Sequence, residues 1–382
     1  TGLKDMSINK KFIGLMSGTS ADSIDAVLIA LGSNNFQILH THSIKISTDM
    51  REEINSLAIS GSDEIHRLSK LDKSLGLLFS QAANELLILS KLANTDITAI
   101  GSHGQTIRHH PPSAIIKKYE GYSLQVGDPN TIVEETGITT VANFRGRDMA
   151  LGGQGAPLVP GFHQAFFEKT GSVRAIVNIG GISNITLLPG DGLAKSVLGY
   201  DTGPGNGLMD KWTKINIGKN YDKGGAWAAQ GVTIRALLSN LMDTPYLFIS
   251  PPKSTGPELF NIGWLESLLE KLPKYRPEDI QATLLEFTAQ TINKALSLYP
   301  LNINEVFICG GGAYNTVLIN RLKELIAPVI VESTSILGIA PEWVEASAFA
   351  WLAKQTTEGL PGNIPASTGA EKSAVLGAIY TK

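Results

Sequence analysis

Asp201 is the strongest candidate for acid–base chemistry in this sequence. It follows the apolar segment 196–200 and enters a loop that contains Gly203 and Gly205. A carboxylate that a short loop holds in place can act as a general base. The apolar residues after the loop indicate a helix whose N-terminus could face an anion. The same pattern also fits a structural cap of that helix.

The turn that begins at Gly18 has the residues of a phosphate cradle. Backbone N–H groups and the hydroxyls of Thr19 and Ser20 can surround phosphate oxygens where glycine lets a ligand approach closely. Asp22 follows. A carboxylate beside a bound phosphate requires a cation such as Mg²⁺ between them, directly or through water. For this stretch alone, a plain tight turn capped by Asp22 is the favoured interpretation.

Two further turns are rich in glycine. The segment from Asn178 through Gly180 and Gly181 joins two apolar runs. The triplet Gly310, Gly311 and Gly312 follows the apolar run 306–309 and precedes a helical pattern over 316–325. Three glycines permit flat backbone contact with a planar or phosphorylated ligand such as adenosine, and they also permit tight packing of helix on strand. No G-x-G-x-x-G follows the first strand, which counts against a Rossmann dehydrogenase.

The segment 142–157 is polar, dense in glycine and carries Arg145 and Arg147. A guanidinium suits carboxylate or phosphate oxygens, and a surface salt bridge is the alternative for either arginine. The histidines at 103, 109 and 110 lack the cysteine partners and spacing of a structural zinc site. The single cysteine, Cys309, is interpreted as a small buried side chain in a reducing compartment.

The elements that position these residues follow one plan twice. Apolar runs at 11–16 and 24–31 predict a hairpin, 36–46 a third strand, 50–92 helices, and 97–101 a buried strand. The run 173–188 again has the pattern strand, glycine turn, strand. We therefore predict two related α/β lobes, with 1–140 plus about 366–382 in the N-terminal lobe and 141–365 in the C-terminal lobe. A helix over 370–380 is expected to return to the first lobe.

Composition excludes several classes. The 382 residues include 32 Lys and Arg against 35 Asp and Glu, a formal net charge of -3. Without a long run of one charge sign, neither nucleic acid nor an anionic membrane is an expected partner. No apolar stretch reaches the length that spans a bilayer, and the polar segment 1–11 has no signal-peptide core. These features predict a cytoplasmic protein.

Six motifs, in this order, resemble those of the anhydro-N-acetylmuramic acid kinase family. They are Gly-Leu-Met-Ser-Gly-Thr-Ser from Gly14, Ser-His-Gly-Gln-Thr-Ile-Arg-His from Ser102, Gly-Gly-Gln-Gly-Ala-Pro-Leu-Val-Pro from Gly152, Asn-Ile-Gly-Gly-Ile-Ser-Asn from Asn178, Asp-Thr-Gly-Pro-Gly-Asn from Asp201 and Pro-Lys-Ser-Thr-Gly from Pro252. The likeness extends from Phe12 to Leu376. One departure is Ser23, where the family usually has glycine; a positive φ there would cost about 1 kcal/mol.

The resemblance implies a two-lobed actin-like, hexokinase-like fold of duplicated RNase H-like topology, with ATP in the interlobe cleft. It implies that the enzyme opens 1,6-anhydro-N-acetylmuramic acid with water, phosphorylates O6 using ATP and Mg²⁺, and forms a homodimer. Asp201 is then the base. Glu345, Arg147 and Thr106 would contact the sugar, and Arg147 suits the carboxylate of the lactyl group. The residues that would contact the nucleotide are Gly18, Thr19, Ser20, Asp22, Asn178, Gly180, Gly181, Gly310, Gly311 and Gly312, with Asp22 reaching Mg²⁺ through water.

Two rival interpretations remain open from the sequence. One is another sugar kinase of the same fold, which would phosphorylate a free hydroxyl without water as a cosubstrate. The other is a non-catalytic actin-like ATPase, because a nucleotide site alone does not define a reaction. Arg147, the segment 152–157 and Glu345 favour a sugar kinase, since an ATPase without a sugar substrate has no use for them.

Overall fold

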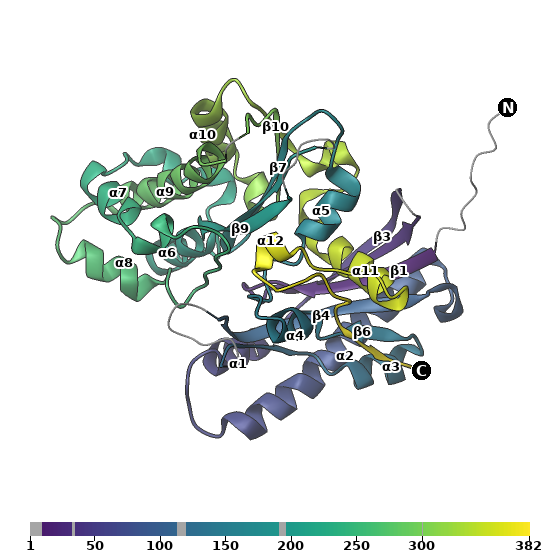
Figure 1. The fold of residues 1–382 in the computed structure, drawn as a ribbon. Coiled ribbons are helices and arrows are strands. Elements are labelled where there is room, and N and C mark those ends of the chain that lie inside the picture. Colours follow the sequence, from purple (N-terminus) through teal and green to yellow (C-terminus); the bar gives the residue numbers. More distant parts are fainter. Residues whose placement is uncertain (1–9, 33–34, 113–119, 191–195, 300) are drawn as a thin grey trace. The chain divides into compact units, whose positions relative to one another are not determined.

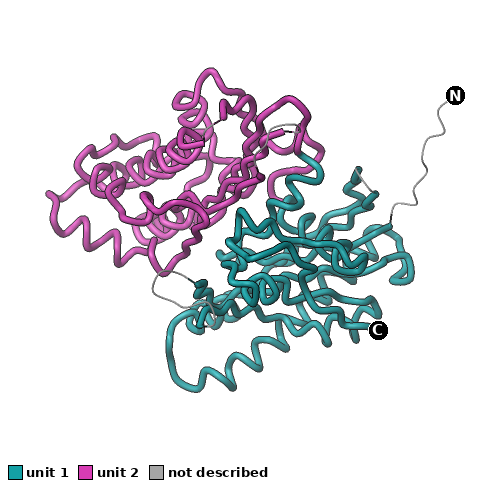
Figure 2. The backbone as a smooth tube through the Cα atoms, viewed as in Figure 1, with its two compact units in different colours: residues 1–167, 343–382 teal, residues 168–342 magenta. Residues whose placement is uncertain are grey.

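The computed structural model describes residues 10–32, 35–112, 120–190, 196–299 and 301–382. It divides into two compact units (Figure 2): unit 1 comprises residues 1–167 and 343–382, and unit 2 comprises residues 168–342. The boundaries between the units lie at 167/168 and 342/343, not near 140 and 365 as the sequence predicted. Both β6 (Thr140–Ala142) and α11 (Val344–Thr357) belong to unit 1, because β6 pairs with β4 (Ala99–His110) and α11 packs against β4.

Unit 1 is built on a mixed sheet. Among its described residues, seven strands are ordered β12-β6-β4-β1-β2-β3, with β5 paired to β4. The strands β1, β2 and β3 are antiparallel neighbours, whereas β4 runs parallel to both β1 and β6. The strands not yet given bounds are β1 (Lys10–Ser17), β2 (Ser23–Leu31), β3 (Phe36–Lys45), β5 (Tyr122–Val126) and β12 (Ala378–Tyr380).

Helices cover this sheet (Figure 1). The predicted helical region 50–92 is two helices, α1 (Thr48–Leu57) and α2 (Glu64–Ser90), and α2 buries an apolar face that includes Leu75 and Phe79. The core beneath it contains Ile13, Leu28 and Ile100. The other helices of unit 1 are η1 (Asn94–Asp96), α3 (Pro129–Thr136), α4 (Phe144–Ala150), α5 (Pro160–Phe167) and α12 (Pro365–Thr368).

Two glycines let α11 lie directly against the sheet. Gly14 of β1 and Gly101 of β4 are paired in register. A Cβ atom at Gly14 would overlap the carbonyl oxygen of Ala346, and one at Gly101 would overlap that of Phe349. Side chains at either position would push the helix away, so glycine here is a packing requirement. This close approach also fixes where Glu345, in the first turn of α11, leaves the helix.

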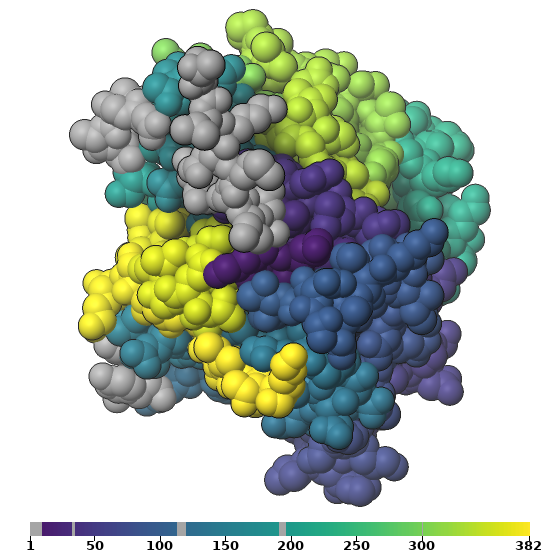
Figure 3. Space-filling model, turned by 90° about the vertical axis from the view of Figure 1, so that its right-hand side faces the viewer, coloured from purple at the N-terminus to yellow at the C-terminus, as the bar shows by residue number. Residues whose placement is uncertain are grey.

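The C-terminal segment returns to unit 1 as a strand, which corrects the helix predicted over 370–380. Gly377 has φ 85°, and β12 then pairs antiparallel with β6. Sheet hydrogen bonds to β6 outweigh the weak helical pattern of this segment, whose two ends are marked by Gly369 and Gly377 in left-handed conformation. In Figure 3 the yellow C-terminal residues lie beside the blue residues of unit 1.

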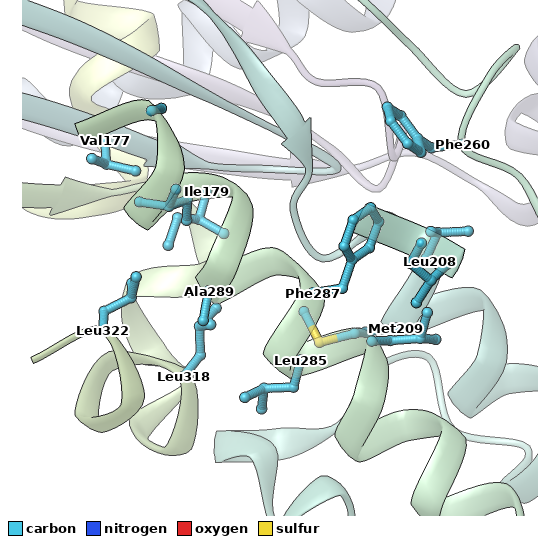
Figure 4. Close-up of a cluster of buried hydrophobic side chains, with 14 of the residues drawn as sticks. Val177, Ile179, Leu208, Met209, Phe260, Leu285, Phe287, Ala289, Leu318 and Leu322 are labelled. Atoms are coloured by element: carbon cyan, nitrogen blue, oxygen red, sulfur yellow. The ribbon is translucent and has the colours of Figure 1, made fainter. Parts of the chain in front are cut away.

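Unit 2 has its own sheet and core. Its described strands are ordered β11-β10-β7-β8-β9, and Figure 4 shows apolar side chains of β7, α6, α9 and α10 meeting in the core. The strands are β7 (Arg174–Ile179), β8 (Ile182–Leu188), β9 (Leu198–Pro204), β10 (Glu305–Cys309) and β11 (Ile330–Ser333). The α-helices are α6 (Gly207–Ile217), α7 (Arg235–Met242), α8 (Ile262–Leu269), α9 (Pro277–Ser297) and α10 (Thr316–Ile326). The 3-10 helices are η2 (Lys223–Gly225), η3 (Ala228–Gln230), η4 (Pro245–Phe248), η5 (Gly311–Tyr314), η6 (Thr334–Leu337) and η7 (Pro341–Trp343), the last at the boundary to unit 1.

The two units repeat one topology. Each unit contains three consecutive antiparallel strands, β1, β2 and β3 in unit 1 and β7, β8 and β9 in unit 2. Two further strands continue each sheet on the other side of β1 or β7 and run parallel to it. The resulting orders are β3-β2-β1-β4-β6 and β9-β8-β7-β10-β11. The α/β class and the duplicated RNase H-like arrangement predicted from the sequence are confirmed. Among the described residues, no helix combines the length and apolar character needed to cross a membrane.

Candidate functional site

The glycine turns of unit 2 meet at the carboxyl ends of two parallel strands. Asn178 of β7 is paired in register with Cys309 of β10, so the turn after β7 lies beside the triplet that begins at Gly310. A Cβ atom on Gly310, whose φ is 76°, would overlap Asn178 Oδ1. Ligands in α/β proteins bind outside the carboxyl ends of parallel strands. The structure thus joins two of the predicted nucleotide segments, those at 178–181 and 310–312.

Asn178 carries a buried acceptor without a partner. The residue is 5% exposed, and its Oδ1 receives no hydrogen bond. An unsatisfied buried polar atom is costly and points to a group that the bare chain does not supply. The atom lies against the backbone of Gly310, which is where the sequence predicted contact with a nucleotide.

The loop that follows Asp201 packs onto the first of these turns. Asn206 N donates to Gly180 O at 2.7 Å, and the amides of Gly205 and Gly207 donate to Gly181 O at 3.0 Å each. The glycines are required because a Cβ atom on Gly205 would overlap Gly180 O. All three glycine segments of unit 2 therefore form one cluster.

Asp201 lies on β9 and is anchored by the segment 244–256. The residue is 9% exposed, and Oδ2 accepts a hydrogen bond from Thr255 N at 2.9 Å. Its carbonyl oxygen accepts from Tyr246 Oη at 2.7 Å. The N-cap of α6 is Asn206, so Asp201 is not the structural cap that the sequence left open. A fixed carboxylate next to the glycine cluster can take a proton from a bound water molecule.

Lys253, which sequence reasoning gave no role, is buried close to Asp201. It is 8% exposed, and Nζ lies 4.6 Å from the ring centre of Tyr246 and 5.7 Å from that of Tyr200. Burial, with a smaller contribution from Lys294, lowers the pKa of Lys253 to about 8, although Asp201 acts in the opposite direction. The signal was present in the motif 252–256, which combines a lysine with hydroxyl residues, but spacing alone assigned it no role.

The first glycine turn lies in unit 1, between β1 and β2. Ser17 Oγ donates to Gln105 Oε1 at 2.7 Å, and Gln105 Nε2 donates to Gly18 O at 3.3 Å. These bonds anchor the base of the turn, while Thr19 and Ser20 at its tip are exposed. The arrangement leaves both hydroxyls available to an anionic ligand.

Asp22 differs from the expected metal partner in one respect, because Arg51 already contacts it. Arg51 Nη1 donates to Asp22 Oδ1 at 2.5 Å, and the Asp22 side chain is 60% exposed. The replacement of glycine by Ser23 causes no backbone strain: Ser23 lies in β2, and the left-handed residue of the turn is Ala21, with φ 50°. Ser23 Oγ instead donates to Asp25 Oδ1 at 3.1 Å.

Two arginines near the start of α4 have different environments. Arg145 Nη1 donates to Gly155 O at 2.8 Å, and its Nε donates to His103 Nε2 at 3.1 Å. Burial holds the pKa of His103 well below its ordinary value, so the ring is the neutral acceptor that this bond requires. Arg147 is exposed and has no side-chain partner among the described residues. Of the two, Arg147 is the arginine available to a ligand.

The glycine segment after α4 is fixed by a buried carboxylate. Asp148 is fully buried, and its Oδ2 accepts from Gly155 N at 2.8 Å. Its Oδ1 accepts from Asn363 Nδ2 and Thr368 Oγ1, both at 2.7 Å. Three neutral donors compensate the carboxylate for lost solvation. The predicted sugar-binding segment is thereby tied to the C-terminal part of the chain.

The predicted sugar residues all belong to unit 1. Thr106 extends from β4 beyond the end of β1, where its Oγ1 accepts from Gln125 Nε2 at 3.1 Å. Arg147 follows β6, and Glu345 is partly buried in the first turn of α11. Thr106 and Arg147 thus come from the carboxyl-terminal side of parallel strands, where ligands of α/β proteins bind.

The two lobes repeat one strand order, and each has glycine turns at the carboxyl ends of its parallel strands. These features define the class of duplicated actin-like α/β proteins. The sequence identifies one family within that class. A sequence model of the anhydro-N-acetylmuramic acid kinase family matches residues 10–382. The chain belongs to this family, as its motifs predicted.

Curated relatives and solved structures are similar over most of the chain. The anhydro-N-acetylmuramic acid kinase of Shewanella oneidensis is 49% identical over 97% of this chain and 98% of its own length; that of Shewanella sp. strain MR-7 is 50% identical over the same shares. An activator of 2-hydroxyisocaproyl-CoA dehydratase from Clostridium difficile with bound ADPNP covers 91% of this chain and 97% of its own, with 15% identity and a TM-score of 0.45. A ROK family glucokinase from Streptomyces griseus with glucose and AMPPNP covers 90% and 99%, with 11% identity and a TM-score of 0.39. At these values the two solved structures add nothing to the topology described above.

Proposed function

We propose that this chain hydrolytically opens 1,6-anhydro-N-acetylmuramic acid and phosphorylates its O6 from ATP, giving N-acetylmuramic acid 6-phosphate in the recycling of cell-wall peptidoglycan. The observation that carries the proposal is family membership over residues 10–382, with relatives about half identical across nearly the whole chain. The anchored carboxylate of Asp201 beside the glycine cluster supports it.

In the proposed reaction, water attacks the anomeric carbon while the bond from that carbon to O6 breaks. O6 takes the γ-phosphoryl group, ADP leaves, and Asp201 accepts the proton of the attacking water. The hydrogen bond from Thr255 N to Asp201 Oδ2 orients the carboxylate for this proton transfer. This role makes Asp201 the catalytic residue of the proposal.

The substrate contacts follow from exposure and charge. Arg147 is proposed to bind the lactyl carboxylate, since its guanidinium is exposed and suits a planar anion. Thr106 and Glu345 are proposed to bind the sugar, with Glu345 also orienting the attacking water. Phosphate contacts are assigned to Gly18, Thr19, Ser20, Asn178, Gly180 and Gly181, and adenosine contacts to Gly310, Gly311 and Gly312.

Mg²⁺ fits this set of residues as an ion held mainly by nucleotide phosphates. The described residues include no group of three or more His, Cys, Asp or Glu that could hold a metal, and Mg²⁺ in kinases commonly uses one or two carboxylates. The ion would supply neutralisation of phosphate charge. Asp22 suits a contact through water, because Arg51 engages its Oδ1 and the side chain stays largely exposed.

Oligomeric state and location are part of the same proposal. We expect a homodimer in the cytoplasm, by likeness to the family. Sedimentation velocity of the purified chain tests the first expectation, and a mass of one 40.8 kDa chain would contradict it. Cell fractionation tests the second.

The test of the reaction uses water labelled with ¹⁸O. Purified protein is mixed with the anhydro-sugar, ATP and Mg²⁺, and the product is read by mass spectrometry before the anomeric oxygen exchanges with solvent. We expect a phosphorylated sugar with ¹⁸O at the anomeric carbon. ADP formation with the anhydro bridge intact would contradict the proposed substrate and favour an ATPase or another sugar kinase.

A further inference from the structure

One segment of unit 2 contacts Asp201 at its backbone and at its side chain. Tyr246 Oη donates to the carbonyl oxygen of Asp201, Thr255 N donates to its Oδ2, and Asp201 N donates to Lys253 O at 3.3 Å. The two parts of this segment are joined by Lys253 Nζ, which donates to Tyr246 O at 3.2 Å. These hydrogen bonds link Asp201, Tyr246 and Lys253 to one another.

Burial of the charged side chain of Lys253 at this position is energetically unfavourable. Lys253 as a residue is 8% exposed, so its side chain loses hydration on folding, and an apolar side chain of similar volume could take its place. The rings of Tyr246 and Tyr200 offer cation–π attraction, with Nζ 4.6 Å and 5.7 Å from their centres. Asp201 supplies the opposite charge that acts on Lys253. A charge held here therefore interacts with Asp201 and Lys294 and with the rings of the two tyrosines.

We infer that Lys253 is a positioning residue for Asp201: it holds Tyr246 in place to bind the Asp201 carbonyl, and its positive charge attracts the carboxylate. The inference rests on the proposed role of Asp201 as general base. Lys253 touches neither substrate nor water in this scheme. It acts through Tyr246 and through its electric field.

The charged and titratable groups around Lys253 come from three elements. Asp201 and Tyr200 lie on β9, Tyr246 on η4 and Lys294 on α9, and Glu258 adds a negative charge that acts on Tyr246. Burial and Lys294 lower the pKa of Lys253 to about 8, while burial raises that of Tyr200 to about 12 and holds that of Tyr246 high. Lys253 therefore loses its positive charge as pH rises through about 8.

The first experiment compares Lys253→Met with Lys274→Met, which removes an exposed lysine of the same unit. We expect Lys253→Met to lower kcat by about 10- to 100-fold, with the KM of the anhydro-sugar within about twofold, because a small displacement of a catalytic group affects the chemical step. Tyr246→Phe, which removes the donor to the Asp201 carbonyl, should lower kcat in the same direction. The control should retain normal turnover.

The pH profile separates positioning from a merely structural role. The kcat of the unchanged protein should fall as pH rises through about 8, where Lys253 loses its proton. That fall should be absent in Lys253→Met, and Lys253→Arg should keep activity to higher pH. Lys294→Gln removes a repulsive charge and should move the midpoint upward. This variant tests the inference even if Lys253→Met does not fold.

The outcomes distinguish the inference from the function on which it rests. If Asp201→Asn is inactive but Lys253→Met has normal kcat and an unchanged basic limb, the inference is overturned and the proposed base stands. An unshifted midpoint in Lys294→Gln also overturns the inference. Near-normal turnover of Asp201→Asn would remove the proposed base itself, and the role of Lys253 with it.

Discussion

The hairpin turns after β1 and after β7 occupy the same place in the same strand order, yet they are built differently. In unit 1 the turn ends in exposed hydroxyls at Thr19 and Ser20. In unit 2 the carbonyl groups of Gly180 and Gly181 accept hydrogen bonds from the loop that begins at Gly203. One topology thus yields an open turn and a packed turn, because the neighbouring loops differ.

The two candidate aspartates show the same contrast. The side chain of Asp22 is 60% exposed and contacts a surface arginine, whereas Asp201 is a buried residue held by backbone and side-chain donors. An exposed ion pair contributes little to stability and is easily rearranged. A buried, anchored carboxylate has a fixed direction, which catalysis requires. Variants of both units test this contrast.

The largest effect is expected at Asp201. Asp201→Asn keeps the acceptor for Thr255 N but removes the proton acceptor, so kcat should fall about 100- to 10,000-fold. Asp243→Asn, at an exposed aspartate of unit 2, is the matched control. Turnover is measured by ADP release in the presence of the anhydro-sugar. Near-normal turnover of Asp201→Asn would refute the assignment of the base.

A second difference should appear in the packed cluster of unit 2. Gly310→Ala places a Cβ atom against Asn178 Oδ1 at a φ of 76°, whereas Gly171→Ala, at φ 73°, meets no atom within 4 Å. Both variants carry left-handed strain of about 1 kcal/mol, and overlap should raise the cost at Gly310 to about 3 kcal/mol. Urea unfolding measures both. Equal costs would show that the cluster tolerates the added atom.

Acid should destabilise unit 1 before unit 2. All seven histidines of the chain lie in unit 1; burial lowers the pKa of His163 to about 3 and holds that of His103 well below its ordinary value. Below pH 6.5 these histidines bind protons in the unfolded chain but stay neutral in the folded unit. The free energy of unfolding of unit 1 therefore decreases as pH falls below 6.5. Each of these two buried histidines should cost about 1.4 kcal/mol by pH 5.5.

Hydrogen exchange at pH 7.5 and 5.5, analysed for each unit, measures this loss. His163→Leu should weaken the pH dependence of unit 1, while the same change at the exposed His66 should leave it as it was. Equal losses of protection in both units would contradict the assignment to buried histidines.

The smallest effect is expected at Asp22. Asp22→Ala removes an exposed ion pair with Arg51, so unfolding free energy should change by less than about 0.5 kcal/mol. The KM for MgATP should rise about three- to tenfold if Asp22 contacts the hydrated ion. Arg51→Met, which removes the same ion pair from the other side, is the control. A similar rise in both variants would assign the effect to the turn rather than to the carboxylate.

Much of the architecture could be predicted from local patterns. The alternation of apolar runs and glycine turns predicted the first hairpin, its repeat at 173–188 and the helix after Gly312, since such signals act over a few residues. The boundaries near 140 and 365 and the helix over 370–380 did not match the structure. Sheet membership of β6 and β12 depends on partners far away in the chain, and no local pattern contains those partners.

The sequence by itself determined the family, the duplicated α/β plan and the residue types of the candidate site. Motifs and apolar periodicity are properties of short, continuous segments, so they can be recognised without the fold. Tertiary structure alone decided that Arg145 is occupied by His103 while Arg147 is exposed. It also decided that Lys253 is buried beside Tyr246 and Asp201. The physical reason is that burial, hydrogen-bond partners and the pKa of a side chain depend on neighbours that only the folded chain brings together.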